Sequence, residues 1–370
     1  MRKVFTNNDF GAQTAIANSP GALISVMQAC LVDGYGDQTP TSIVRAGATA
    51  TMVLPNPHGF TRTGVLNVSG CDQADYNGEF RVTVVDALTV TFTVANSPTS
   101  PATGTIVCRQ DGAGWTMPFT GTDKAAFKQG ASSNGLYLDI DDTSSSMSKV
   151  RGYETMSGVG VGVAPFPTPA QELSLYWLKG AATSDWVIVA DEHFVIVWTP
   201  EGNTQYYTSG MWFFGDYRTT FGINNYGTLL LASISTSTPV GGLAQLDANS
   251  STSTNHRYIA RDHTQIGASR QVSLVGNSSM TQGDSFCSAG GSDYPDPLSG
   301  NVYMQELAIM ATGGSNNLLG HVDGTYSMLH DTPLGNSAIN YFGGSGDFLN
   351  DEFAYFPAYS NAAVVVRISD

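Results

Sequence analysis

Charged residues are scarce in this chain. They make up 13% of its 370 residues, about half of the usual share. Basic residues are the scarcest, with 16 Lys and Arg against 31 Asp and Glu, which gives a formal net charge of −15. A grip on nucleic acid needs a basic patch that neutralises phosphates, so this balance argues against a nucleic-acid-binding protein. The charge fits a soluble acidic protein but identifies no partner.

Long hydrophobic runs are also missing. No segment approaches the roughly 18 apolar residues that a membrane-spanning helix needs. The basic start, residues 1–3, is followed by Asn7-Asn8-Asp9, where a signal peptide would have its apolar part. We therefore expect a protein that is made in a cytoplasm, stays soluble and does not insert into a membrane.

Cysteines are few, and none of the four has the CxxC spacing of a zinc or redox site. They are Cys30, Cys71, Cys108 and Cys287. Cys71 and Cys108 belong to the same short stretch of β pattern and could lie close in space. We expect free, partly buried thiols.

The most informative stretch that is present runs from His58 to Gly104. Val90, Phe92 and Val94 alternate with threonines, and this two-residue period predicts a half-buried strand. Tyr76-Asn77-Gly78 supplies a turn, since Asn and Gly tolerate positive φ, and Ser-Pro pairs close the unit. The stretch is therefore predicted to be a small all-β module.

The rest of the chain predicts a mainly β protein, a β-sandwich or barrel scaffold with long loops. Low charge, 41 glycines and 41% hydrophobic residues fit such a scaffold better than a helical bundle or a disordered chain. Two dense runs of β-formers, 186–190 and 194–198, predict a buried hairpin. Residues 122–129 are predicted to form a short helix. The loops are expected at 247–253 and 276–300, and a last strand at 362–368.

The small module resembles the FCCH-type β-barrel, a unit named after a half-domain of ubiquitin-activating enzymes and common in phage structural proteins. The match rests on His58-Gly59-Phe60, Ser69-Gly70, Tyr76-Asn77-Gly78 and residues 101–105. No ubiquitin-activating chemistry follows, because the nucleotide site of such an enzyme is absent.

A second resemblance covers most of residues 30–230. The order of motifs is similar to that of a family of virion proteins from tailed bacteriophages, which have GW-x-PF, RGYE-x-M, WxxxAD and FGD motifs. In this sequence they are Gly114–Phe119, Arg151–Met156, Trp186–Asp191 and Phe214–Asp216. The resemblance implies a component of the virus particle, with capsid decoration, minor capsid and tail positions all open.

The two resemblances together predict a domain organisation. Residues 1–40 join the main scaffold, residues 41–110 form the inserted barrel, and residues 111–370 form the main scaffold. The scaffold is expected to have two subdomains, 111–235 and 236–370. Insertion at an exposed loop whose ends lie close together is physically reasonable.

Candidate metal ligands are few. Asp139 and Asp141 share one face of a predicted strand and could hold a divalent cation, but no calcium-loop pattern surrounds them. We favour the alternative, a strand end with solvated carboxylates. The six histidines lack the spacing of a metalloprotease pair. We therefore predict no cofactor and no metal.

Catalytic patterns are likewise missing. Neither a G-x-S-x-G nucleophile nor a P-loop occurs. The adjacent carboxylate pairs Asp191-Glu192 and Asp351-Glu352 would point to opposite faces of a strand, which does not suit a glycosidase. Tyr206, Tyr207 and Trp212 are candidate aromatic contacts for a glycan, although we favour a core role for this aromatic belt.

The sequence thus predicts a non-enzymatic bacteriophage virion structural protein that assembles on the particle surface. A capsid decoration or minor capsid position is slightly preferred over a tail position. The expected partners are other virion proteins and further copies of the chain. The alternative is a tail or baseplate protein that recognises a host through a surface glycan.

Overall fold

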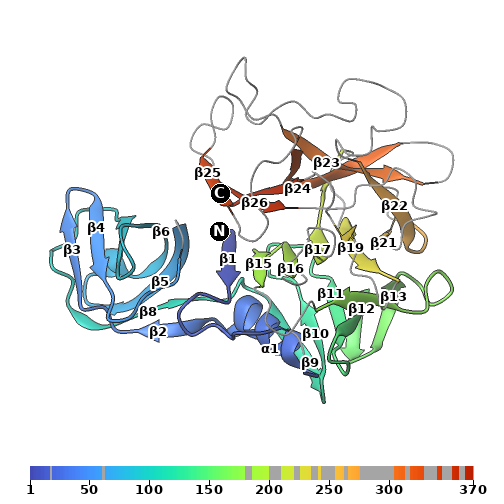
Figure 1. The fold of residues 1–370 in the computed structure, drawn as a ribbon, viewed down its shortest axis with the longest axis horizontal. Coiled ribbons are helices and arrows are strands. Elements are labelled where there is room, and N and C mark those ends of the chain that lie inside the picture. The colour runs from blue at the N-terminus through green and yellow to red at the C-terminus, as the bar shows by residue number, and fades with distance from the viewer. Residues whose placement is uncertain are drawn as a thin grey trace.

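The computed structural model describes residues 1–16, 19–60, 63–179, 186–199, 210–220, 226–234, 241–242, 255–261, 266–275, 304–312, 317–328, 340–343, 352–357 and 363–369. These residues are mainly β, which confirms the predicted fold class (Figure 1). The described helical parts are α1 (Ala22–Gln28), the π-helical turn Ala29–Asp33 and the 3-10 turn Ala74–Tyr76.

A continuous antiparallel path of strands links the N-terminus to the C-terminal sheet. The path runs, in pairing order, through β1 (Lys3–Thr6), β15 (Val187–Ala190), β16 (Phe194–Thr199), β17 (Gly210–Asp216), β19 (Thr228–Ser233), β21 (Asn255–Ile259), β22 (Arg270–Val275), β23 (Met304–Ala311), β24 (Leu318–Met328), β27 (Ala363–Arg367), β26 (Glu352–Pro357) and β25 (Asn340–Gly343). Two short strands, β18 (Arg218–Thr219) and β20 (Gly241–Gly242), pair with β24 and β17.

A second antiparallel path joins the first at β19. It consists of β9 (Thr116–Gly121), β10 (Lys124–Lys128), β11 (Tyr137–Asp141), β12 (Met147–Gly158) and β14 (Leu175–Leu178). The long β12 also pairs with β13 (Val161–Phe166), which forms a hairpin with it.

A separate seven-stranded sheet, called here the small sheet, lies to one side of these paths (Figure 1). In spatial order it contains β2 (Tyr35–Gln38), β8 (Gly104–Gln110), β5 (Thr63–Cys71), β6 (Gly78–Val84), β7 (Thr89–Thr93), β4 (Thr49–Val53) and β3 (Ser42–Ala46). Tyr35 pairs with Gln110, so the sheet begins and ends at adjacent positions. The predicted division at residues 41 and 110 stays a prediction, although the strands themselves span residues 35–110.

The small sheet has a hydrophobic core of its own. Val90, Phe92 and Val94 are buried as their alternation predicts, and Tyr76 at the predicted turn is completely buried. Cys71 and Cys108 both belong to this core as free thiols. Burial of this apolar set gives the sheet its own source of stability.

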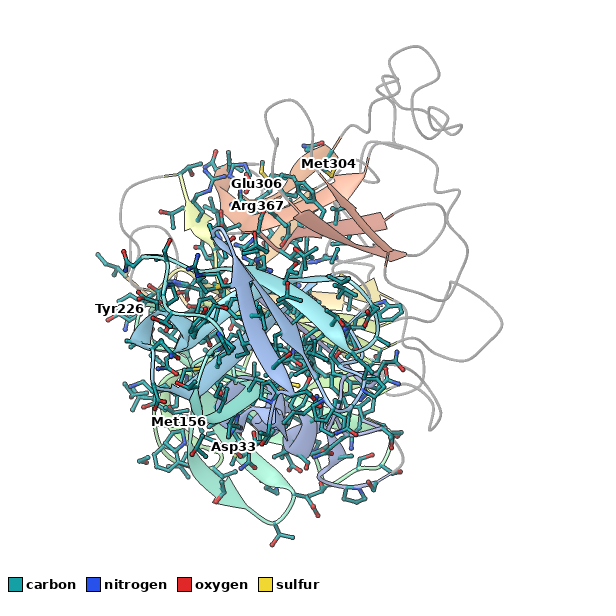
Figure 2. The ribbon with its side chains drawn as sticks, turned by 90° about the vertical axis from the view of Figure 1, so that its left-hand side faces the viewer. Asp33, Met156, Tyr226, Met304, Glu306 and Arg367 are labelled. Atoms are coloured by element: carbon teal, nitrogen blue, oxygen red, sulfur yellow. The ribbon has the colours of Figure 1, made fainter. Side chains whose placement is uncertain are left out.

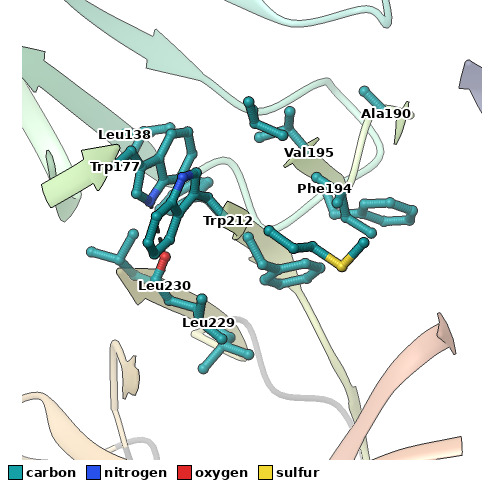
Figure 3. Close-up of a cluster of buried hydrophobic side chains, with 14 of the residues drawn as sticks. Leu138, Trp177, Ala190, Phe194, Val195, Trp212, Leu229 and Leu230 are labelled. Atoms are coloured by element: carbon teal, nitrogen blue, oxygen red, sulfur yellow. Dashed lines mark hydrogen bonds between the residues drawn. The ribbon is translucent and has the colours of Figure 1, made fainter. Parts of the chain in front are cut away.

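The main core lies between the two strand paths (Figure 3). Every residue of β15, β16 and β19 is buried, which explains why these strands read as continuous apolar runs without alternation. The indole nitrogens of Trp177 and Trp212 donate hydrogen bonds to the carbonyl oxygens of Leu231 and Leu178, at 2.9 and 3.0 Å. The polar atoms of these large side chains are therefore satisfied inside the core.

Two local predictions have clear outcomes. The buried hairpin is confirmed, because β15 and β16 pair antiparallel with Val187 opposite Trp198. The helix predicted at 122–129 is wrong, since Lys124–Lys128 form β10. The strand is favoured because Ala125, Ala126 and Phe127 are all buried, which two-sided packing of a strand allows. Asp123, at φ 53°, forms the preceding turn.

The final strand β27 lies between β24 and β26, so it is an interior strand of the C-terminal sheet. The loops predicted at 247–253 and 276–300 lie outside the described residues, as does Cys287. Among the residues that the structure describes, no helix is long and apolar enough to cross a membrane.

Candidate functional site

A polar cavity of about 550 Å³ lies where four parts of the chain meet. Its lining includes Arg2 just before β1, Glu79 of the small sheet, Glu192 of the β15–β16 turn, and Asp323 and Arg367 of the C-terminal sheet. Cationic and anionic side chains thus face the same space. We call the turn Asp191-Glu192-His193, which borders this cavity, the central turn.

Arg2 is the main link across the cavity. Its Nε lies 3.2 Å from a carboxylate oxygen of Asp191, and its Nη2 lies 2.8 Å from one of Asp323. A third guanidinium nitrogen donates to the carbonyl oxygen of Arg367 at 2.9 Å. The guanidinium also stacks 5.0 Å from the ring centroid of Phe194. A planar fork with several donors suits such a multiple contact, which a lysine could not reproduce.

The neighbouring residues fasten the small sheet to the same place. Lys3 forms an ion pair with Glu79 and donates to the carbonyl oxygen of Gly112 at 2.7 Å. Arg81 donates to the carbonyl oxygen of Arg2 at 3.1 Å, and the Gln110 amide donates to that of Val4 at 2.9 Å. Arg2 and strand β1 therefore hold the scaffold, the C-terminal sheet and the small sheet together.

The central turn is held in place by the Asp191 side chain and by close packing against Gly130. Asp191 accepts hydrogen bonds from the backbone N–H of His193 at 2.8 Å and of Phe194 at 3.2 Å. Gly130 has its backbone against Glu192, where an added Cβ would lie only 2.6 Å from the Glu192 Cβ. The turn needs glycine at position 130 because no larger residue fits.

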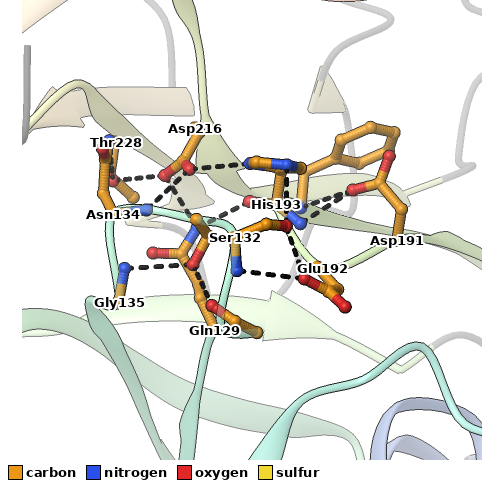
Figure 4. A network of polar contacts seen from close by, with 12 residues as sticks. Gln129, Ser132, Asn134, Gly135, Asp191, Glu192, His193, Asp216 and Thr228 are labelled. Carbon is orange, nitrogen blue, oxygen red and sulfur yellow. Dashed lines mark hydrogen bonds and ion pairs between the residues drawn. The ribbon is translucent and has the colours of Figure 1, made fainter. Parts of the chain in front are cut away.

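Ser132, His193 and Asp216 form a linear chain of polar contacts (Figure 4). The Ser132 Oγ lies 3.2 Å from the His193 Nε2, and the His193 Nδ1 lies 3.2 Å from a carboxylate oxygen of Asp216. The contact with Asp216 is the main cause of a raised pKa for His193, which favours the imidazolium form.

Asp216 is held rigidly at the end of β17. Its carboxylate accepts hydrogen bonds from the Gln129 amide at 2.8 Å, the Asn134 backbone N–H at 3.0 Å and the Thr228 hydroxyl at 2.9 Å. With His193 as a fourth partner, the carboxylate joins the 129–135 loop, the central turn and β19. This is the most densely bonded carboxylate of the site.

The order serine–histidine–aspartate is that of a nucleophilic triad, but the surroundings of Ser132 oppose this use. An acyl-transfer enzyme needs N–H donors aimed at the developing oxyanion beside its serine. Here the Ser132 backbone N–H donates to the Glu192 carboxylate at 3.0 Å, and the Ser132 hydroxyl donates to the same oxygen. A negative charge therefore occupies the place where the oxyanion would form, and the chain of contacts ties the 129–135 loop to the central turn.

The predicted metal ligands lie on one strand face, as expected, but have other partners. Asp141 pairs with Lys124 at 2.6 Å, and Asp139 accepts a hydrogen bond from the Gly160 backbone N–H at 3.0 Å. Burial raises the pKa of Asp139, whereas hydrogen bonds from Lys124 and Thr143 outweigh burial and lower that of Asp141. The part of the chain that the structure describes contains no group of three residues placed to hold a metal ion.

One of the three candidate aromatic contacts has a clear outcome. Trp212 is completely buried in the main core and hydrogen-bonded there, so it has the favoured core role and is no surface contact for a glycan. Its position in a strand covered on both faces explains the burial. Tyr206 and Tyr207 lie outside the described residues.

The two carboxylates of the Asp191-Glu192 pair have different partners. Asp191 pairs with Arg2, while Glu192 accepts from Ser132 on another side of the turn. The second pair is only partly described, since Asp351 lies outside the described ranges. Sequence reasoning missed Arg2, whose partners are up to 365 positions away along the chain. It also gave no role to Ser132 and did not connect the FGD motif with His193.

Comparisons with known proteins add little. No family model matches this chain, and no curated protein matches it. Among solved structures, the chain is similar to the endosialidase of phage phi92, with 11% sequence identity and a TM-score of 0.17, over 89% of this chain and 70% of that chain. A likeness of this size supports no inference about function.

Proposed function

We propose that this chain is a structural protein of a tailed-bacteriophage particle, and that it works by assembly and not by catalysis. The sequence resemblance to virion proteins is the starting point of the proposal. A mainly β fold with a laterally placed small sheet is compatible with it (Figure 1).

The observation that carries the proposal is the convergence of three of the four motifs on one network. Trp115 of the Gly-Trp motif donates its indole N–H to the carbonyl oxygen of Asp191, the end of the Ala-Asp motif, at 2.7 Å. Asp216 of the FGD motif contacts His193 and Gln129. The motif residues thus hold the scaffold together. Motifs that are shared for structural reasons, and not for a common reaction, are expected to have such roles.

The central turn supports the non-enzymatic part of the proposal. Ser132, which contacts this turn, is engaged by Glu192, and the acidic residues of the turn are paired with Arg2 or hydrogen-bonded within the scaffold. A catalytic nucleophile or acid needs access to a substrate and a reacting atom that is not engaged by other protein groups. The contacts of these side chains are instead directed at the protein itself.

The small sheet is proposed to act as a projecting arm that touches a neighbouring subunit or a surface. It has its own core and is attached to the scaffold through contacts with residues 2–4 and through the chain connections beside Tyr35 and Gln110. Long loops and lateral modules on a rigid scaffold are where binding usually resides. The partners in this proposal are other virion proteins and further copies of the chain.

A position on the head, as decoration or minor capsid protein, is part of the proposal, and the number of copies per particle tests it. Quantitative mass spectrometry of purified particles should find the chain in hundreds of copies. A few to a few dozen copies would instead place it in the tail. Absence from washed particles would contradict the proposal.

The glycan-recognition alternative has a separate test. An array of bacterial surface glycans probed with the isolated chain should stay blank if the chain acts only by assembly. Specific binding that persists when the small sheet is removed would favour the alternative, a tail or baseplate host-recognition protein.

A further inference from the structure

The segment that follows β1 lies against the small sheet, backbone to backbone. Gly36 and Gly59 make this close approach possible. An added Cβ at Gly59 would overlap the carbonyl oxygen of Asn8, and one at Gly36 would overlap that of the residue after Asp9. The Phe10 N–H also donates across this contact to the carbonyl oxygen of His58, at 3.2 Å. We call this contact between the scaffold and the small sheet the joint.

Asp9 is buried in the joint, and its carboxylate links the two sides. On the scaffold side it accepts hydrogen bonds from the Thr6 backbone N–H at 2.8 Å and from the Thr6 hydroxyl at 3.0 Å. From the small sheet, the Tyr35 hydroxyl donates to it at 2.9 Å. Asp9 is only 6% exposed, and Gly59 packs against its Cα. The small sheet therefore forms part of the cover that keeps water from this carboxylate.

The buried charge of Asp9 has no cation beside it. In the part of the chain that the structure describes, no lysine or arginine pairs with this carboxylate, and Thr6, Tyr35 and Gln110 supply hydrogen bonds only. Burial outweighs these hydrogen bonds and raises the pKa of Asp9 from 3.8 to about 6. Opening of the joint would return the carboxyl to water, where its charged form is stable. Ionisation of Asp9 and closure of the joint therefore oppose each other.

The other ionisable groups around Asp9 have different roles. Burial raises the pKa of the Cys30 thiol and of the Tyr35 phenol well above their ordinary values, so both stay neutral. His58 is the only histidine of residues 35–110. Its ring nitrogens are engaged within the small sheet, by the next N–H but one at 3.0 Å and by the Asp86 carbonyl oxygen at 2.7 Å. Asp9 is therefore the group whose change of charge acts directly on the joint.

The chain enters and leaves the small sheet at glycines. Gly34 precedes β2, and Gly112 and Gly114 follow β8, with φ of 71° at Gly34 and 89° at Gly114. Asp33, next to the first of them, lies on the side of the molecule away from Arg367 of the C-terminal sheet (Figure 2). Hinges are formed by a few residues at the ends of elements that absorb a change in φ and ψ. Because the small sheet has its own hydrophobic core, it can move about these connections as a unit.

We propose that Asp9 is a proton-operated latch, which holds the small sheet against the scaffold when it is protonated and favours release of the sheet when it is ionised. The stability that Asp9 gives to the closed joint is fully present below pH 3.8 and is lost as the pH rises through about 6. The inference rests on the proposed role of the small sheet as an arm and adds how the arm is released. The latch itself can be tested without a particle.

Hydrogen exchange of the Phe10 amide measures the opening of the joint, because the acceptor of this N–H lies on the other side. After correction for the intrinsic exchange rate, its opening constant should rise about 50-fold from pH 4 to pH 7, as the two pKa values of Asp9 require. Amides of β7 and β16, in the two cores, are the internal references. They should exchange more slowly than Phe10 at every pH, since the joint opens without unfolding either core.

Substitutions test whether Asp9 is the latch. In Asp9→Asn the rise between pH 4 and pH 7 should be lost, and other ionisable groups of the joint, such as Glu79, are the same in both chains. Tyr35→Phe removes a hydrogen bond that favours the ionised form, so it should increase opening far more at pH 7 than at pH 4. Asp139→Asn is the matched control, because burial also raises the pKa of Asp139 but this residue lies in β11 of the scaffold. Exchange at Phe10 should then match that of the unsubstituted chain.

Three outcomes would overturn the proposal. They are an opening constant at Phe10 that does not change with pH, an equal rise in Asp9→Asn, and exchange of Phe10 only together with the core amides. The last result would mean that the joint opens only when the whole chain unfolds. A working latch in a chain that is absent from particles would leave the latch standing and refute the proposed function. A chain that is present in particles but shows no latch would refute this inference alone.

Discussion

Asp142 and Lys179 form an ion pair in the interior of the scaffold, with a carboxylate oxygen 2.5 Å from the ammonium nitrogen and both side chains completely buried. The other carboxylate oxygen accepts from the Leu23 backbone N–H at the start of α1. Ser148 and the carbonyl oxygen of Ser19 complete the set. One pair thus joins α1, the end of β11, β12 and the segment after β14.

Breaking this pair should be costly. Lys179→Met leaves the Asp142 carboxylate buried without its cation, and we expect a loss of about 3–5 kcal/mol in the free energy of unfolding. Lys124→Met is the matched control, because the Lys124–Asp141 pair of 2.6 Å is partly exposed and its loss should cost about 0–1 kcal/mol. Urea unfolding measures both. Equal costs for the two variants would contradict the structural role of the buried pair.

His193 should titrate above its ordinary pKa of 6.5, because Asp216 accepts a hydrogen bond from its ring. The folded protein then binds the proton more tightly than the unfolded chain. The resulting stability is present below pH 6.5 and is lost as the pH rises through the folded-state pKa. NMR of the imidazole gives this value directly. Asp216→Asn should lower it, and an unchanged pKa in that variant would show that Asp216 is not the cause.

Asp9 should give the stability of the protein a second dependence on pH. Burial raises the pKa of this carboxyl from 3.8 to about 6, although Thr6 and Tyr35 donate hydrogen bonds to it. Between these pH values the folded state holds a proton that the unfolded chain has released. Stability should therefore fall as the pH rises from 4 to 6, by about 3 kcal/mol for this group.

The variant Asp9→Asn isolates this contribution. Its unfolding free energy, followed by urea titration at several pH values, should lose most of the fall between pH 4 and pH 6. A wild-type profile that is flat in this range, or a variant with the same slope, would mean that Asp9 ionises normally.

The small sheet should be removable. Tyr35 and Gln110 are register partners, so a short Gly-Asn turn can replace residues 37–109 and join the chain at neighbouring positions. Tyr35 and Gln110 are kept because they contact Asp9 and Val4. The remainder should keep its β circular dichroism and a cooperative thermal transition. Aggregation of this variant under conditions where the full chain is soluble would contradict the independence of the two cores.

The sequence predicted the parts of the fold that depend on local pattern. The β15–β16 hairpin follows from its dense β-formers, and the strand at 89–93 from its alternation. The short helix failed because Ala125 and Ala126 are good helix formers whose burial on both sides of β10 outweighs their propensity.

The candidate site was less accessible to sequence reasoning. Arg2 meets Asp191 and Asp323 only because β1 lies beside β15 and near the C-terminal sheet, and no local pattern contains that information. Trp212 has an aromatic side chain of the kind that stacks on sugars, but the strands that cover β17 bury it completely. The same type of side chain can lie in the core or on the surface, and the contacts that decide this are defined only by the fold.

The most direct test of the account is electron cryomicroscopy of the intact particle at a resolution that traces side chains. We expect density for this chain in the particle, with the small sheet directed at a neighbouring subunit or outward. A particle map in which every protein is assigned and this chain is absent would contradict it.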